Sequence, residues 1–319
     1  LLYPSYGDTY PIYNGSIGMT YEQAGGPEGG LGVLTSDGDT LTLYDRLIHH
    51  YTTSLSTIEI ASQNAAKLIT EFKNYFANAS NGNVGLYKTY IIKNQAADGQ
   101  KVKALLALLD KNNILYSTGS GTGKGFNYET RKEEVFTIAP GDIVISAAQP
   151  RAVMVKALFE PNTKLTDSVT YDITAWAMPY AYGLQAYATT LKMKVSGRYN
   201  EAFEKNNISS AFACVIKWEG KYSATVLAQL LSRGVKVRMS DAAFEAGNEK
   251  FGSGSIIVLQ KGNEKFGNGF WSMVSQLCNK YTVTLYPIAS GMVDKGYDMG
   301  SAHVRQLKAP RVALLTGSS

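Results

Sequence analysis

Side chains that could do chemistry are few in this chain, and their spacing argues against a metal site. The chain has three histidines, His49, His50 and His303, and two cysteines, Cys214 and Cys278. Adjacent residues on a helix point about 100° apart, so His49 and His50 are poorly placed to share one metal ion. No HExxH pattern or comparable ligand set occurs. We therefore expect no metal site in this chain. Two cysteines also exclude a disulfide scaffold and a Cys-rich zinc module.

The glycine-rich stretch 119–124 (GSGTGK) is the nearest approach to a phosphate-binding loop. Such a loop needs GxxxxGK followed by Ser or Thr, because backbone N–H groups and a hydroxyl must meet the phosphates and their metal ion. Here Thr118 stands where the first glycine is required, and Gly125 stands where the hydroxyl is required. We expect this stretch to be a flexible loop without phosphate chemistry.

Composition and charge bound the class of protein. The 319 residues are 45% hydrophobic and 18% charged, which suits folded domains and excludes a disordered chain. No run of about 18 apolar residues predicts a membrane-spanning helix. The net charge of +5 is uneven, with −5 in residues 1–80 and +10 in the rest. The Lys and Arg residues are scattered without a basic stripe or an aromatic–basic motif, so no nucleic-acid partner is expected.

The first 82 residues predict one strand and one long helix. Residues 17–24 have the pattern of a short strand, and the glycine-rich loop 25–30 follows it. Thr42 and Asp45 match a capping box, which satisfies free backbone N–H groups at a helix start. Apolar residues then recur at three- and four-residue steps as far as Phe76, and Asn81–Gly82 provides the stop signal. A helix with so long an apolar face needs a surface to pack against.

This segment resembles the end of a known catalytic domain. The stretches 2–9 (LYPSYGDT) and 18–22 (GMTYE), followed by a long terminal helix, are similar to the end of the catalytic domain of zinc carboxypeptidases. The large secreted, multidomain bacterial members are the most similar. The resemblance covers about a quarter of the chain. It implies that Glu22 is the general base, which activates a zinc-bound water and passes the proton to the leaving amine.

The same resemblance sets expectations for substrate and metal. Tyr13 is the nearest candidate for the family's substrate-contacting tyrosine. The family's zinc ligands, a His-x-x-Glu pair and a later histidine, would lie upstream of this strand. Zinc is therefore expected in the parent protein and not in this chain. We expect the chain to be a piece of a longer protein that is inactive alone.

The rest of the chain has the pattern of a diverged repeat, residues 87–160 and 212–288. Each copy begins with a short apolar strand, 89–93 or 213–217, followed by a helical pattern. Further strands are expected at 114–116 and 143–145 in one copy, and at 235–237 and 256–258 in the other. Helices are expected near 149–159 and 266–280. Strand–helix–strand order predicts mainly parallel sheets with helices on their faces. Residues 311–315 would begin a further strand.

This region is also similar to the glutamine-amidotransferase-like accessory domains that follow the catalytic domain in those carboxypeptidases. An active amidotransferase needs a cysteine at a sharp strand–helix turn and a histidine base. Cys214 lies inside a predicted strand and Cys278 on a predicted helix, so both are expected to be buried apolar residues. The aromatic segment 171–183 is expected either to line a binding cleft or to pack between the two units. Packing is the favoured interpretation, because Tyr and Trp dominate buried interfaces.

The sequence thus predicts an α/β chain of four segments. These are a carboxypeptidase-like remnant (1–82), an α/β unit (83–165), an aromatic-rich connection (166–210) and a second α/β unit (211–319). Two functions stay open: a fragment of a periplasmic or extracellular zinc metallocarboxypeptidase acting on peptides, or a non-catalytic module that binds a peptide, a glycan or a partner domain. The expected partners are a peptide substrate, the upstream catalytic segment, and a second copy paired through the exposed N-terminal helix.

Overall fold

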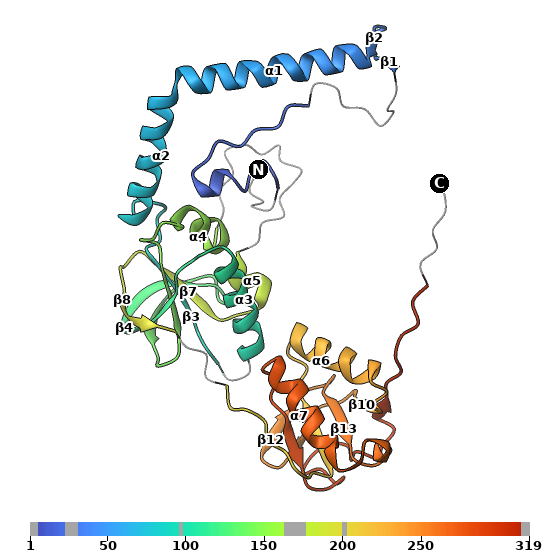
Figure 1. Cartoon of the computed structure of the whole chain (residues 1–319). Helices are drawn as coiled ribbons and strands as arrows, with labels where there is room; N and C mark the ends of the chain where they lie inside the picture. The colour runs from blue at the N-terminus through green and yellow to red at the C-terminus, as the bar shows by residue number, and fades with distance from the viewer. Residues whose placement is uncertain (1–5, 23–30, 96–97, 163–176, 200–202, 314–319) are drawn as a thin grey trace. The chain divides into compact units, whose positions relative to one another are not determined.

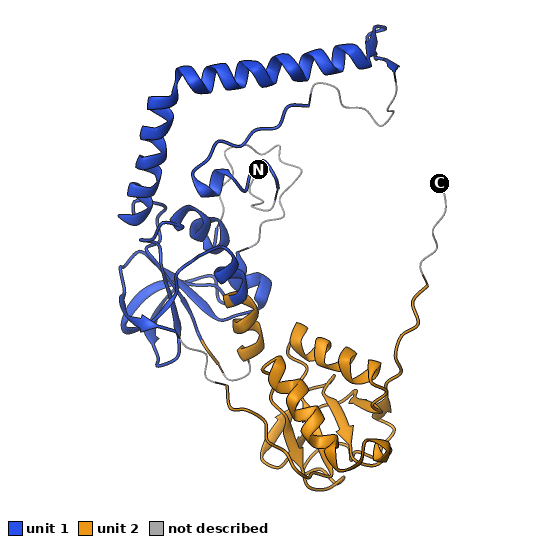
Figure 2. Cartoon of the chain, in the orientation of Figure 1, with its two compact units in different colours: residues 1–93, 107–199 blue, residues 94–106, 200–319 orange. Residues whose placement is uncertain are grey.

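The computed structural model describes residues 6–22, 31–95, 98–162, 177–199 and 203–313 (Figure 1). The chain forms two units, shown in separate colours in Figure 2. Unit 1 comprises residues 1–93 and 107–199, and unit 2 comprises residues 94–106 and 200–319. Each unit has its own sheet, and small two-stranded hairpins accompany these sheets. The domain boundaries expected at residues 82, 165 and 210 stay predictions.

The N-terminal part of unit 1 lacks the strand expected at residues 17–24. Residues 17–22 have no regular secondary structure, and residues 23 and 24 lie outside the described part. A short helical turn (Ile12–Asn14) precedes them, and a small hairpin of β1 (Gly32–Leu34) and β2 (Thr40–Thr42) follows. Since no described strand pairs with residues 17–22, their backbone groups have no ladder that would hold them as a strand.

The predicted long helix is present as two helices, α1 (Leu43–Gln63) and α2 (Ala65–Ser80). The capping box is confirmed, because the Asp45 N–H donates to the Thr42 hydroxyl and the Thr42 N–H donates to the Asp45 carboxylate. The prediction of one continuous helix is wrong at Asn64, whose φ of −106° and ψ of 15° interrupt the helical geometry. The stop signal at Asn81 and Gly82 is confirmed.

Helix α1 contributes no buried residue to the described part of unit 1. The apolar side chains of Leu47, Tyr51 and Ile58 are 61%, 62% and 66% exposed. The residues that the structure describes therefore leave the apolar face of α1 uncovered.

The main sheet of unit 1 has the order β5-β4-β6-β3-β7, and β8 also pairs with β4. Strand β4 pairs with β6 near its start and with β7 near its end, so the sheet curls back on itself. Helix α5 (Met178–Tyr182) precedes β7. Helix α3 (Gly99–Lys111) follows β3 in the chain, and its residues 99–106 are grouped with unit 2. The other elements are β3 (Thr89–Ile92), β4 (Ser117–Asn127), β5 (Glu133–Ile138), β6 (Ile143–Ser146), α4 (Ala152–Phe159), β7 (Ala186–Thr189) and β8 (Lys194–Arg198).

The main sheet of unit 2 has the order β14-β9-β13-β10-β15. A hairpin of β11 (Phe244–Ala246) and β12 (Glu249–Phe251) is inserted between β10 and β13. A 3-10 helix (Glu264–Gly269) leads into α7. The other elements are β9 (Ala213–Ile216), α6 (Lys221–Ser232), β10 (Val237–Ser240), β13 (Ile256–Leu259), α7 (Phe270–Lys280), β14 (Tyr286–Ile288) and β15 (Val304–Gln306).

Both units share one strand order, but the prediction of parallel sheets is wrong. Every strand pairing in the described residues is antiparallel. In the sheet of unit 1, β6 lies between β3 and β4, the two strands that α3 connects. In the sheet of unit 2, β13 lies between β9 and β10, the two strands that α6 connects. This is the split β-α-β arrangement of ferredoxin-like folds. The element order along the chain resembles that of a parallel sheet, because the two strands that the helix connects run parallel. The inserted strand is antiparallel to both of them.

The glycine-rich stretch expected to be a flexible loop belongs to strand β4. Its glycines stand where other groups approach the strand backbone closely. A Cβ at Gly119 would lie 2.6 Å from the Lys194 carbonyl oxygen, and one at Gly125 would lie 2.7 Å from the Ala188 carbonyl oxygen. Glycine therefore serves close packing here, as it does elsewhere in strand interiors.

The sheet of unit 2 has a core on each face. One face packs on α6 and α7, with Cys214, Val258, Leu230 and Phe270 among its buried residues. The opposite face carries Val215 and Ile257 together with the β11–β12 hairpin and residues 293–304. Strand alternation explains the division, since successive side chains point to opposite faces.

Two remaining expectations concern the chain's later segments. Of the aromatic segment, residues 171–176 lie outside the described part; Tyr180 on α5 packs edge-on against Tyr128, with ring centroids 5.1 Å apart. Residues 311–313 are not a strand, and 314–315 are not described. Among the described helices, none combines the length and apolarity that crossing a bilayer requires.

Candidate functional site

The two residues singled out by the carboxypeptidase resemblance lie in the N-terminal part of unit 1. Glu22 is exposed and lies in the segment without regular secondary structure. Tyr13 lies in the short helical turn and is half-buried, and this burial raises the pKa of its hydroxyl. No described hydrogen bond joins the two residues, and their roles as general base and substrate-contacting tyrosine stay predictions.

The histidines and other ligand-type side chains do not assemble a metal centre in the described residues. No group of three His, Cys, Asp or Glu side chains is placed to hold a metal ion there. His49 and His50 are exposed on α1. The zinc expected in the parent protein, with ligands upstream of this chain, stays a prediction.

The strongest candidate site is a pocket of about 370 Å³ in unit 2. Its polar lining residues are Lys236, Arg238, Lys261 and Gln306. Its apolar lining consists of Phe212, Leu259 and Met299, and the backbone at three glycines completes the wall. Three cationic side chains around one small pocket are an electrostatic arrangement for an anion.

Strand register places two of the polar side chains side by side. Arg238 on β10 is the direct partner of Gln306 on the neighbouring strand β15. Directly opposed residues of an antiparallel pair have Cβ atoms about 4.5–5.5 Å apart and point to the same face. A guanidinium and a side-chain amide thus offer several N–H donors to one ligand at this end of the sheet.

A buried asparagine brings the two lysines to the same rim. Asn263 is fully buried. Its Oδ1 accepts a hydrogen bond from the backbone N–H of Lys236 at 2.8 Å. Its Nδ2 donates to the backbone carbonyl oxygens of Lys236 and Leu259 at 3.0 and 2.9 Å. These bonds fix the segment that enters β10 against the loop that leaves β13. Lys236 and Lys261 lie on these two segments, so Asn263 positions both.

The apolar wall depends on a glycine in the connection between β14 and β15. A Cβ at Gly291 would lie 3.0 Å from Cζ of Phe212, so glycine allows the Phe212 ring to lie against this connection. The ring is 43% exposed, whereas Met299 is almost completely buried. The pocket therefore offers an accessible aromatic surface beside its cations.

One carboxylate lies close to this cationic rim. Glu264 accepts a hydrogen bond from the Gly262 N–H at 2.7 Å. Backbone hydrogen bonds lower the pKa of the Glu264 carboxyl, and the charges of Lys236 and Lys261 lower it further. Glu264 is therefore ionised at neutral pH and offsets part of the positive charge.

A second polar cluster lies at the other end of the β10–β15 ladder. Oδ1 of Asp241 lies 2.7 Å from Nδ1 of His303, and Oδ2 of Asp241 lies 2.7 Å from a guanidinium nitrogen of Arg305. The His303 ring stacks on Tyr297, with centroids 3.8 Å apart. These contacts fasten the segment 297–305, which includes the pocket residues Met299 and Gly300.

The cysteines have no nucleophilic role in this structure. Both are buried, as predicted, and burial raises the pKa of each thiol to about 12. Cys214 lies within β9 and Cys278 within α7. A protonated, buried thiol inside a strand or helix lacks the exposure that a catalytic nucleophile needs.

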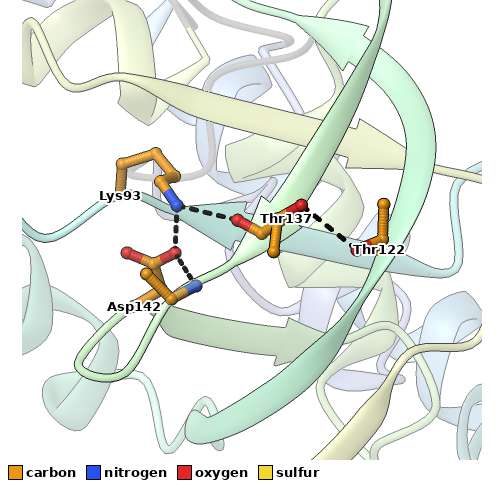
Figure 3. A network of polar contacts seen from close by, with 5 residues as sticks. Lys93, Thr122, Thr137 and Asp142 are labelled. Atoms are coloured by element: carbon orange, nitrogen blue, oxygen red, sulfur yellow. Dashed lines mark hydrogen bonds and ion pairs between the residues drawn. The ribbon is translucent and has the colours of Figure 1, made fainter.

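A further network in unit 1 joins charged residues but stabilises the fold. Figure 3 shows the Lys93 ammonium bonded to the Asp142 carboxylate and to the Thr137 carbonyl oxygen. The side chains of Lys93 and Asp142 are 19% and 4% exposed. The Asp142 carboxylate also accepts the Ala139 N–H at 2.8 Å, so it anchors the turn before β6.

Comparison with known proteins finds no match. No protein-family model matches it, and no curated protein or solved structure is significantly similar to it. The assignment of the pocket as the candidate site therefore depends on its geometry.

Sequence reasoning missed the pocket because its residues come from five separate stretches. The Lys and Arg residues after position 80 are scattered along the sequence. The two units differ in the connection that follows β7 in unit 1 and β14 in unit 2. In unit 1 it comprises only residues 190–193, whereas in unit 2 it comprises residues 289–303 and lines the pocket.

Proposed function

We propose that this chain acts as a binding module and that the pocket of unit 2 binds an anionic ligand. The observation that carries the proposal is the convergence of Lys236, Arg238 and Lys261 on one pocket. None of the three has a described ion-pair partner within salt-bridge distance. Their charges are thus available to a ligand.

The size and composition of the pocket support this function. Small-molecule sites typically measure about 300–1,000 Å³ and combine apolar walls with a few polar groups that orient the ligand. This pocket lies at the lower end of that range, with Phe212, Leu259 and Met299 as its apolar part. Arginine adds geometric selectivity, because its planar fork matches carboxylate and phosphate oxygens.

Calorimetric titration of the 319-residue chain with simple organic anions tests the proposal. Binding is expected for the wild-type chain and is expected to weaken about tenfold or more in Arg238→Gln, which loses a charge-assisted hydrogen bond. Lys250→Gln is the matched control, because Lys250 belongs to the same unit, is 83% exposed and does not line the pocket. Equal affinity of both variants would contradict the proposal.

A second candidate rests on the exposure of Glu22. We infer that the parent protein is a secreted zinc metallocarboxypeptidase and that Glu22 is its general base. The exposed carboxylate is available to a catalytic centre completed by other parts of the parent protein. In a longer chain that carries the zinc ligands, Glu22→Gln is expected to abolish peptide hydrolysis with little change in thermal stability. Activity that survives this change would exclude Glu22 as the base.

A further inference from the structure

The charges around the pocket of unit 2 constrain what kind of anion it takes. The lining carries Lys236, Arg238 and Lys261, and no carboxylate of the described residues lines it. Glu264 is the acidic group held at the rim, through the Gly262 N–H. Three positive charges and one negative charge leave a site with two uncompensated positive charges.

We infer that the ligand is a dianion with an apolar group attached, an inference that rests on the proposed anion-binding function. A dianion matches both remaining positive charges, whereas a monoanion matches only one of them, so the dianion gains the larger Coulomb attraction. A phosphate monoester and a dicarboxylate share this chemistry, since each presents two negative charges close together at neutral pH.

The polar groups divide into two donor pairs that suit such a ligand. Arg238 and Gln306 face each other across the β10–β15 ladder. Lys236 and Lys261 lie on the two segments that Asn263 joins. One pair offers planar N–H donors and the other offers ammonium charges, so oxygen atoms on two sides of a dianion can be bound at once.

The apolar part of the ligand is assigned to Phe212. Phe212 is 43% exposed, whereas Met299, another apolar residue of the pocket, is almost completely buried. An apolar group stacked on this ring removes both surfaces from water. Inorganic phosphate lacks such a group and leaves the ring exposed.

Four ligands titrated into the full chain test the inference: phenyl phosphate, phenylsuccinate, 3-phenylpropionate and inorganic phosphate. At least one of the two aromatic dianions is expected to bind about tenfold or more tightly than the monoanion 3-phenylpropionate, because it gains a charge-assisted interaction. Phenyl phosphate is expected to bind more tightly than inorganic phosphate. The tighter of the two dianions identifies the source as a phosphate ester or a dicarboxylate.

Variants separate the charge argument from simple damage to the fold. Lys261→Gln is expected to weaken the dianions more than 3-phenylpropionate, while Lys250→Gln changes neither. Phe212→Ala is expected to lower the affinity for phenyl phosphate to that for inorganic phosphate. Thermal melting of each variant shows whether it is folded, and Lys236→Gln replaces Lys261→Gln if the latter is not.

The outcomes distinguish this inference from the function on which it rests. Equal affinity for the monoanion and both dianions would overturn the dianion inference and leave anion binding intact. Binding of none of the four ligands would overturn both. Equal loss of mono- and dianion affinity in Lys261→Gln would also contradict the charge argument.

Discussion

Replacing Asp142 by alanine is expected to destabilise unit 1 strongly, because it removes one partner of a buried ion pair. The Asp142 side chain is only 4% exposed, and it accepts hydrogen bonds from the Lys93 ammonium and the Ala139 N–H. The substitution leaves Lys93 with the Thr137 carbonyl oxygen, 3.0 Å away, and no countercharge in the described network.

The magnitude follows from burial. Breaking a buried pair by removing one partner costs about 3–5 kcal/mol. Lys93 is 19% exposed and can regain some water, so we expect the lower end, about 3 kcal/mol. For a unit of this size, each kcal/mol shifts the melting temperature by about 2–4 °C, which gives a fall of about 6–12 °C.

Unit 2, which has the same strand order, supplies the control. Lys217 on unit 2 holds the position that Lys93 holds on unit 1, and its Nζ lies 2.8 Å from Oε2 of Glu249. That carboxylate is 44% exposed, and Lys217 also lies 4.5 Å from the centroid of the Tyr286 ring. Glu249→Ala is therefore expected to cost less than about 1 kcal/mol.

Urea denaturation of both single variants, followed by circular dichroism, measures these free energies of unfolding. Lys93→Met combined with Asp142→Leu is expected to recover most of the loss, because apolar replacement of both partners leaves no buried charge unpaired. The reasoning is refuted if Asp142→Ala costs no more than Glu249→Ala, or if the double variant is as unstable as Asp142→Ala.

Three further predictions follow from packing. Gly125→Ala is expected to cost about 1–3 kcal/mol, since its Cβ would lie 2.7 Å from a β7 carbonyl oxygen; Gly252→Ala, with open space around its Cβ, is the control in urea denaturation. Asn263→Ala is expected to cost about 3 kcal/mol and to weaken anion binding, because it leaves buried backbone groups unpaired; unchanged affinity would exclude its positioning role. Burial raises the thiol pKa of Cys214 and Cys278 to about 12, so both thiols are protonated at pH 8. They are therefore expected to react with a thiol reagent only after unfolding. Fast labelling of the folded chain would contradict this.

Local patterns in the sequence determined many of the elements. The apolar runs at 89–92 and 213–216 are strands in which every residue is buried. The Thr42 and Asp45 pair marked a helix start, because a capping box uses only atoms within four residues. The burial of both cysteines was also predictable, since each lies in an apolar stretch of a strand or a helix.

Strand direction and the role of the glycines depended on distant parts of the chain. Strands joined by a helix run parallel, and β6 or β13 between them replaces a parallel pairing by two antiparallel ones. The glycines of β4 resembled a loop because their sequence does not show which backbone approaches them. A local pattern carries no information about such contacts, which form only when the sheet is assembled.

The candidate site was decided by tertiary structure for the same reason. The sequence established that residues 81–319 carry a net positive charge, but their Lys and Arg residues were interpreted as dispersed surface charge. The pairing of Arg238 with Gln306 depends on strand register, and the approach of Lys236 to Lys261 depends on the buried side chain of Asn263. Charge is a property of each residue alone, whereas a binding site requires charges to converge, and only the fold brings these residues together.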